Sequence, residues 1–224
     1  MNVYRIPLTQ LNPRDALRYL GLKNGLEDPA MAALYETCAR ALLPVIDARS
    51  VWRLFPLKDG EIKGCTYRLE GNSIREHLAG CDRVILLAAT LGPAVDALIR
   101  RSMYTGMAEA MMIDALASGA VEQVLDKTEA EIFAKLPATG HTWRFSPGYG
   151  DLPLESQKTL LEVLDARKRI GVYVSSSMLM TPTMSVTCLI CLGDNLPEGT
   201  KKSCRSCTLE GKCIFRQNGT TCFA

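Results

Sequence analysis

The chain has 224 residues, of which 47% are hydrophobic and 22% charged, and its formal net charge is +2. This length and composition fit a globular protein with one sizeable core, or one domain with an appendage. So small a net charge predicts no general affinity for nucleic acid or for a membrane surface. The N-terminus lacks a signal-peptide pattern, and no segment approaches the roughly 20 apolar residues that span a bilayer, so we expect a cytoplasmic protein.

The C-terminal segment 200–224 differs in composition from the rest of the chain. It carries a net charge of +4, because five basic side chains accompany only Glu210, and the preceding part therefore carries −2. Six of the nine cysteines lie from position 188 onward. We therefore predict a folded domain at 1–199 and a cysteine-rich tail at 200–224.

The first ninety residues alternate between helical and extended patterns. Helices are expected at 13–21 and 30–47, and Asp28-Pro29 is a typical start for the second. The expected extended elements are a β-hairpin, with strands at 51–57 and 61–69 around a turn at 58–60, and a buried strand at 82–90. Between them, Asn72-Ser73 is expected to cap a short helix at 74–79.

The remaining pattern again mixes helices and strands. Gly92-Pro93 opens a helix ending near Tyr104, and 107–135 is the longest helical pattern, with an apolar stripe at Met112, Leu116, Ala120 and Val124. Further elements are expected as strands at 141–146, 171–176 and 184–193 and a helix at 154–168. The strands follow no strict βαβ rhythm, which predicts an α+β fold with a mainly antiparallel sheet flanked by helices. No G-x-G-x-x-G or P-loop pattern follows a strand, which argues against Rossmann and Walker nucleotide sites.

The segment Arg144-Phe145-Ser146-Pro147-Gly148-Tyr149 has an unusual composition for a loop. An arginine can hold a carboxylate through two parallel hydrogen bonds. Pro147 restricts the backbone, Gly148 allows a tight turn or close approach to a ligand, and Tyr149 offers a flat face with a polar tip. These properties suit a loop that binds a zwitterionic or nucleotide-like small molecule.

This Arg-x-x-Pro-Gly-Tyr segment resembles the S-adenosylmethionine-binding loop in the activation domain of cobalamin-dependent methionine synthase. Upstream, IDALASGAVEQVLD at 113–126 resembles the helix of that family whose ligand-binding glutamate falls on Glu122. Downstream, 154–193 resembles the helix and strands of the family, with its Met-x-Pro-x-x-Ser-Val segment at 180–186. The resemblance covers about residues 85–193, and it leaves the N-terminal aspartate contact of the family unplaced.

The resemblance implies a free-standing activation subunit that supports reductive remethylation of cob(II)alamin, as a component of methionine synthase (methyltransferase) activity. S-adenosylmethionine would be its ligand, and the cobalamin would belong to a partner, either a methionine synthase or another corrinoid protein. Arg144 would pair with the methionine carboxylate, and Glu122 would accept hydrogen bonds from the ammonium or the ribose. The backbone at Ser146 and Gly148 would also bind the ligand, and Tyr149, as the catalytic residue, would lie near the sulfonium and the corrin.

Each of these side chains also has a plainer interpretation. Arg144 alone is typical of a surface ion pair, Tyr149 of a packed ring, and Glu122 of a solvated carboxylate on the polar side of its helix. Two other functions also remain open: a reductive activator of a different corrinoid methyltransferase, and a zinc-binding interaction module.

The tail contains a C-x-x-C-x₅-C-x₈-C array formed by Cys204, Cys207, Cys213 and Cys222. Four closely spaced thiolates fit a tetrahedral zinc ion or an iron–sulfur cluster, and free or disulfide-bonded thiols are the alternative. A cluster could deliver the electron that reductive remethylation needs.

The other cysteines are expected to be packing residues. Cys188 and Cys191 lie three residues apart in an expected strand, so they point to opposite faces and are predicted to be core or auxiliary residues. The isolated Cys38, Cys65 and Cys81 are predicted to be buried and inert.

Overall fold

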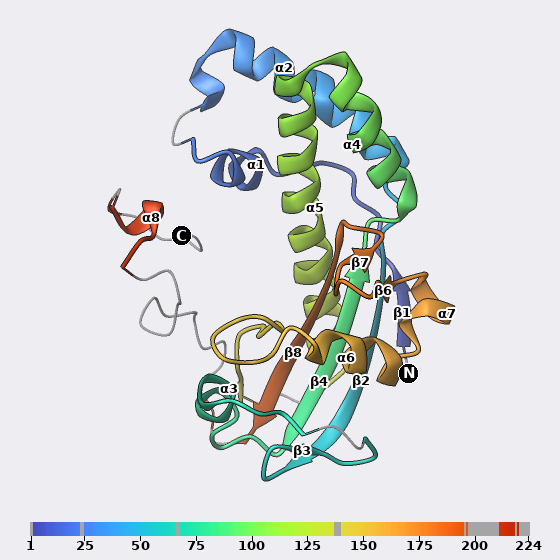
Figure 1. Cartoon of the computed structure of the whole chain (residues 1–224), viewed down its shortest axis with the longest axis vertical. Helices are drawn as coiled ribbons and strands as arrows, with labels where there is room; N and C mark the ends of the chain where they lie inside the picture. The colour runs from blue at the N-terminus through green and yellow to red at the C-terminus, as the bar shows by residue number, and fades with distance from the viewer. Residues whose placement is uncertain are drawn as a thin grey trace.

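The computed structural model describes residues 2–22, 25–65, 68–136, 140–194, 196, 211–217 and 219. Within them, an antiparallel sheet with the strand order β1-β2-β4-β8-β5 forms the centre of the molecule, and β3 pairs with β2 (Figure 1). The strands are β1 Asn2–Arg5, β2 Arg49–Lys58, β3 Glu61–Ile62, β4 Arg83–Thr90, β5 Gly140–His141 and β8 Ser185–Gly193. The predicted α+β fold with a mainly antiparallel sheet is therefore confirmed.

Helices cover the sheet on both faces, so its central strands are buried on both sides. In β4, Ile85 and Leu87 join one core, which we call the α5 core because it contains the buried residues of helix α5. Val84 and Leu86 point the other way, into a second core that we call the α6 core because it contains the buried residues of helix α6. Alternate residues of a strand face opposite sides, which explains why this strand is a continuous apolar run.

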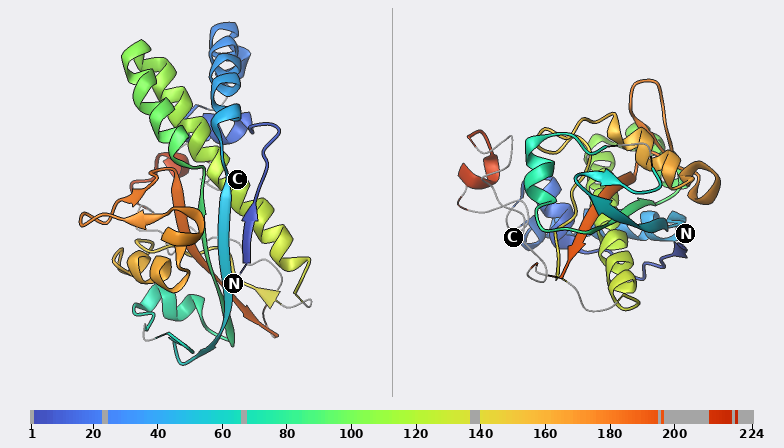
Figure 2. Two further views of the ribbon diagram at one scale, coloured as in Figure 1. Left: turned by 90° about the vertical axis from the view of Figure 1, so that its right-hand side faces the viewer. Right: turned by 90° about the horizontal axis from the view of Figure 1, so that it is seen from below.

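Helix α5, Met107–Phe133, is the main element on the first face. Its expected stripe of Met112, Leu116, Ala120 and Val124 is buried in the α5 core. The other helical segments on this side are α1 Pro13–Tyr19, η1 Gly25–Glu27, α2 Pro29–Leu42, η2 Leu43–Val45 and α4 Pro93–Thr105. Helices α2 and α4 and the N-terminal half of α5 extend beyond the sheet as a helical arm (Figures 1 and 2).

Short elements cover the second face of the sheet. They are α3 Asn72–His77, α6 Ser156–Val163, α7 Ala166–Ile170 and the two-stranded ribbon of β6 Tyr173–Val174 and β7 Met180–Thr181. Helix α8, Ile214–Gln217, is the last described element. None of the described helices combines the length and the apolar character that crossing a membrane requires.

Most of the expected elements are present, and helix α2 begins where its cap predicts. The Asp28 side chain accepts a hydrogen bond from the Ala30 N–H at 2.9 Å. The hairpin after β2 is shorter than expected, because β3 has two residues and only an isolated bridge from Glu61 to Arg68 continues the pairing.

Three expectations about local structure are wrong. Asn72 and Ser73 lie inside α3 and do not cap it from outside. The helix expected at 154–168 divides into α6 and α7 at Asp165, whose φ of 48° is left-handed. The strands expected at 141–146 and 171–176 shorten to β5 and β6. The predicted boundary between 199 and 200 lies outside the described residues, so the division into domain and tail stays a prediction.

Candidate functional site

The loop that follows β5 contains a tight turn at 146–149. The Tyr149 N–H donates to the Ser146 carbonyl at 3.0 Å, and Gly148 has a φ of 83°. Proline at the second position and a glycine with positive φ at the third are the signature of a type II turn. Pro147 and Gly148 therefore determine the shape of this loop locally.

The end of the loop is docked on helix α3. The Asp151 carboxylate accepts hydrogen bonds from the backbone N–H groups of Asn72 and Ser73, the second at 2.9 Å. Donation from Asn72, followed by that from Ser73, holds the pKa of Asp151 below its usual value. A Cβ atom on Gly150 would lie 2.6 Å from the Ser73 side chain, so glycine is required for this close approach.

The side chain of Arg144 extends from the sheet edge to helix α5 and meets three carboxylates. Its guanidinium lies 2.7 Å from Asp126, 2.8 Å from Glu129 and 3.3 Å from Glu122. These residues are spaced i, i+4 and i+7, so they form one row on the helix. We call them the acidic row. Only 19% of the Arg144 side chain is exposed, so these ion pairs are partly shielded from solvent.

The structure thus brings together two predicted site residues, Arg144 and Glu122, although they are 22 positions apart. It also adds Asp126 and Glu129 to the site, neither of which the sequence analysis assigned to it. Their i, i+4, i+7 spacing was the available signal, because it places three acids on one helix face opposite a lone predicted arginine.

The acidic row and Arg144 form a cluster with an excess of negative charge, since three carboxylates face one guanidinium. Burial raises the pKa of Glu129, although Arg144 and His141 lower it. Burial alone would lower the pKa of Arg144, but Asp126 and Glu129 raise it above its usual value. Arg144 therefore stays charged, and the cluster suits a ligand that carries both a carboxylate and a positive group.

Helix α1 crosses α5 one turn before Glu122. A Cβ atom on Gly119 would lie 2.8 Å from the Cβ of Asp15, so this glycine permits the close crossing. Tyr19, at the end of α1, is 49% exposed, and burial followed by the charge of Glu122 raises its pKa. An N-terminal aspartate and a tyrosine therefore border the acidic row, which the sequence analysis did not predict.

Tyr149 belongs to an aromatic cluster on the other face of the sheet. Its ring packs edge-on against Trp143 at 5.2 Å and Phe145 at 5.3 Å, and His77 contacts both of those rings. These rings pack in or against the α6 core, whereas Arg144 reaches α5. Trp143 and Phe145 therefore point to the face opposite Arg144, because alternate residues of an extended segment point opposite ways, and the turn returns the Tyr149 ring to their side.

Ser146 and Gly148 use backbone groups to close the loop itself. The Ser146 carbonyl accepts from Tyr149, and the Gly148 N–H donates to the Leu152 carbonyl at 2.9 Å. These two groups are consequently engaged within the protein, as backbone groups of an ordered loop generally are. Contact of Ser146 and Gly148 with a ligand through other atoms stays a prediction.

The metal prediction for the tail falls mostly outside the described residues. Cys204, Cys207 and Cys222 are not described, while Cys213 is half-buried just before α8. In the part of the chain that the structure describes, no three His, Cys, Asp or Glu side chains are arranged to hold a metal ion. The four-cysteine site therefore stays a prediction.

The other cysteines follow the expectations only in part. Cys188 lies in the α5 core and Cys191 in the α6 core, which confirms that they are core residues on opposite faces. Cys38 is buried as expected. Cys65 and Cys81 are only half-buried, and Cys81 is not isolated, because its thiol donates to the His77 carbonyl at 3.7 Å and it packs against the core that contains Cys191. The tertiary fold packs the segment before β4, which contains Cys81, against the end of β8, which contains Cys191.

Comparison with models of known protein families and with curated protein sequences finds no match. A solved structure described as the MetH reactivation domain bound to AdoHcy does match, with a TM-score of 0.63 and 17% sequence identity. The match covers 100% of this chain and 87% of that one. Both the helices and the antiparallel sheet are included, and the chain therefore has the fold of the MetH reactivation domain.

Proposed function

We propose that this chain is a free-standing, S-adenosylmethionine-binding activation subunit for reductive remethylation of cob(II)alamin on a cobalamin-dependent methionine synthase. The observation that carries the proposal is the contact of Arg144 with the acidic row, directly before the Pro147-Gly148 turn. The shared fold supports it, because the solved reactivation domain is bound to AdoHcy, the demethylated product of this donor.

The donor set of the cluster fits the amino-acid end of the ligand. Arg144 presents parallel N–H groups that match a carboxylate. Asp126 is 66% exposed, so its ion pair with Arg144 is the least shielded from solvent of the three. It is therefore the pair that a ligand carboxylate displaces. Glu122 and Glu129, which are less exposed, then accept hydrogen bonds from the ligand ammonium or ribose hydroxyls.

Helix α1 completes the proposed site. Asp15 lies against α5 one turn before Glu122, and we propose it as the N-terminal aspartate of the ligand site. Tyr19 is half-exposed beside Glu122, and it offers a ring face to the adenine.

Bound S-adenosylmethionine would supply the methyl group, and the cobalamin of the partner would receive it. The role of this chain is to bind and orient the donor, so its contribution to rate is mainly proximity. Tyr149 is held by Trp143 and Phe145 against the α6 core, on the other face of the sheet from Arg144, so no step of the proposed function is assigned to the expected catalytic role of its ring.

Calorimetric titration of the purified chain with S-adenosylmethionine tests the proposal. We expect saturable binding, and we expect Arg144→Ala to weaken it by roughly tenfold or more, because a charge-assisted pair is lost. Arg83→Ala is a matched control, since Arg83 is 27% exposed and also pairs with two carboxylates, Asp82 and Asp194. Absence of both binding heat and a shift in melting temperature for the parent chain would refute the proposal.

A second measurement distinguishes the possible partners. The chain, immobilised and loaded with S-adenosylmethionine, is presented to a methionine synthase that ends after its cobalamin module and to an unrelated corrinoid methyltransferase. Retention and remethylation of the first protein alone is the expected result. Activity only with the second would favour the alternative partner, and tight zinc without donor binding would favour an interaction module.

A further inference from the structure

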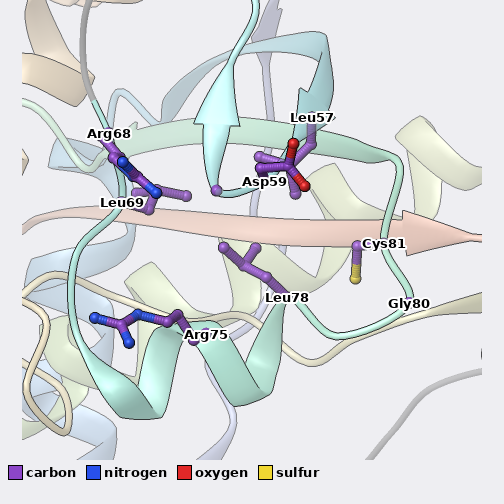
Figure 3. A pocket seen from close by; sticks show the side chains of 9 residues that line it. Leu57, Asp59, Arg68, Leu69, Arg75, Leu78, Gly80 and Cys81 are labelled. Carbon is purple, nitrogen blue, oxygen red and sulfur yellow. The ribbon is translucent and has the colours of Figure 1, made fainter.

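The end of the sheet opposite the helical arm, where α3 and β3 lie (Figure 1), contains a cavity of about 420 Å³, which is drawn from close by in Figure 3. Its wall is formed by the β2–β3 turn, helix α3 and the connection from α3 to β4. The lining side chains that provide its charge, its apolar surface and its thiol are Leu57, Asp59, Arg68, Arg75, Leu78 and Cys81. None of them belongs to the Arg144 cluster, so this cavity is a separate site.

The charge of the cavity favours an anionic ligand. Arg68 and Arg75 line it together with one carboxylate, that of Asp59, so positive charge is in excess. Leu57 and Leu78 are buried and provide an apolar surface beside the charged groups. A small molecule with carboxylates and a short apolar portion matches this combination.

One thiol, that of Cys81, lines this cavity, and a second, that of Cys191, is buried in the adjoining core. Cys81 is half-buried, and it packs against the α6 core, which contains the fully buried Cys191 of β8. The Cys81 thiol donates to the His77 carbonyl at 3.7 Å. The neighbouring Cys191 thiol lowers the pKa of Cys81, whereas burial raises the pKa of Cys191. Cys81 is therefore the more readily ionised and the more accessible of the two sulfurs, as an attacking thiol must be.

The backbone holds Cys81 against the strand that contains Cys191. The Asp82 N–H donates to the Leu192 carbonyl at 3.0 Å, which continues the β4–β8 pairing to the residue after Cys81. Gly193 allows the close packing, because a Cβ atom there would collide with the Gly80 carbonyl and lie 3.3 Å from the Cys81 Cα. The backbone of Cys81 is therefore packed against the end of β8, two residues beyond Cys191.

We propose that Cys81 is a thiol–disulfide exchange site for a small disulfide that carries carboxylates, with Cys191 as its resolving thiol. The Cys81 sulfur attacks one sulfur of the small disulfide, the S–S bond breaks, and the departing thiolate takes the proton that Cys81 gives up. Cys191 then attacks the Cys81 sulfur of the mixed disulfide and releases the second small thiol with the remaining proton. Two electrons pass from the protein thiols to the small disulfide, which leaves as two thiols.

Peptide mass mapping of the full chain after timed exposure to oxidised glutathione tests this proposal. Cys65 is half-buried in the same molecule and serves as an internal control. We expect a linked Cys81–Cys191 peptide to form about tenfold faster than modification of Cys65, and we expect Cys191→Ala to trap one glutathionyl group on Cys81. Modification of Cys65 at the same rate as Cys81, or absence of the linked peptide in the parent chain, would overturn the proposal.

A second set of variants tests the class of ligand. Arg68→Gln and Arg75→Gln are expected to slow the reaction with oxidised glutathione about tenfold, because they remove charges that attract the carboxylates. The same variants should leave the rate with neutral bis(2-hydroxyethyl) disulfide unchanged, and Arg100→Gln on exposed α4 should alter neither rate. Equal slowing of the reactions with both disulfides, or no slowing of either reaction, would show that the arginines do not select an acidic disulfide. S-adenosylmethionine binding plays no part in this outcome, so the two proposals succeed or fail separately.

Discussion

At the scale of single residues, His77 of helix α3 makes the stability of the protein depend on pH through its contacts with Trp143 and Phe145. Its ring lies 4.9 Å from that of Trp143 and 4.8 Å from that of Phe145, and its buried Nε2 has no hydrogen-bond partner among the described residues. Burial lowers the pKa of His77 to about 4. The unfolded chain takes up this proton near pH 6.5, whereas the folded chain does so only near pH 4.

Between pH 6.5 and pH 4 the unfolded state therefore binds more protons at His77, so the free energy of unfolding falls as the pH is lowered. The contribution is complete above pH 6.5, and its loss across this window is of the order of 3 kcal/mol. We expect His77→Phe to flatten the pH dependence of stability in this window, as measured by urea unfolding at half-unit pH steps. An unchanged slope would show that His77 is not the group responsible.

At the scale of elements, a buried carboxylate joins the first turn of α4 to the turn between β7 and β8. Asp96 accepts hydrogen bonds from the Thr183 N–H at 2.8 Å and its hydroxyl at 2.7 Å, and a longer one from the Met184 N–H at 3.4 Å. Asp96→Asn keeps the shape but places donors opposite donors, so we expect a loss of about 1–3 kcal/mol. A lower denaturant midpoint with an unchanged m-value would show this.

The exposed Glu36 of α2 provides the control for this variant. Glu36→Gln should change the free energy of unfolding by less than about 0.5 kcal/mol, as most surface substitutions do. If Asp96→Asn were as mild as this control, the hydrogen bonds to the β7–β8 turn would contribute little to stability.

Elements whose signals are local could be predicted from the sequence. The apolar run of β4, the stripe of α5 and the Pro147-Gly148 turn each depend on neighbouring residues, and all three are present. The misplaced start of α3 has the opposite cause. Its N-terminal N–H groups are bonded by Asp151, which lies 78 and 79 residues away, and no local pattern encodes such a partner.

The candidate site shows the same division between local and long-range signals. The spacing of Glu122, Asp126 and Glu129 is local and could be read from the helix period. Their convergence on Arg144, and the separation of Arg144 from Tyr149, depend on which face of the sheet α5 covers. The crossing of α1 at Gly119 is likewise a tertiary contact, which is why Asp15 and Tyr19 could not be assigned from sequence.

At the scale of the whole molecule, the proposed remethylation needs an electron as well as a methyl donor, and the predicted cysteine site of the tail is the candidate source of that electron. The buried residues of the α5 and α6 cores all lie at or before Leu192, whereas the four predicted tail ligands lie between 204 and 222. Thiolates placed among the five basic side chains of 200–224 would have their negative charge offset. This charge balance fits a metal centre that is added to the domain for its chemistry.

Reconstitution of the full chain with iron and sulfide under anaerobic conditions tests this prediction. We expect a bound metal centre, visible in absorption and paramagnetic-resonance spectra if it is an iron–sulfur cluster, that both Cys204→Ser and Cys213→Ser remove. Cys65→Ser is the control, because Cys65 lies in the described domain and outside the array. A colourless protein with one tightly held zinc ion, lost in the same two variants, would keep the four-cysteine site but exclude it as an electron relay, since zinc has no redox chemistry.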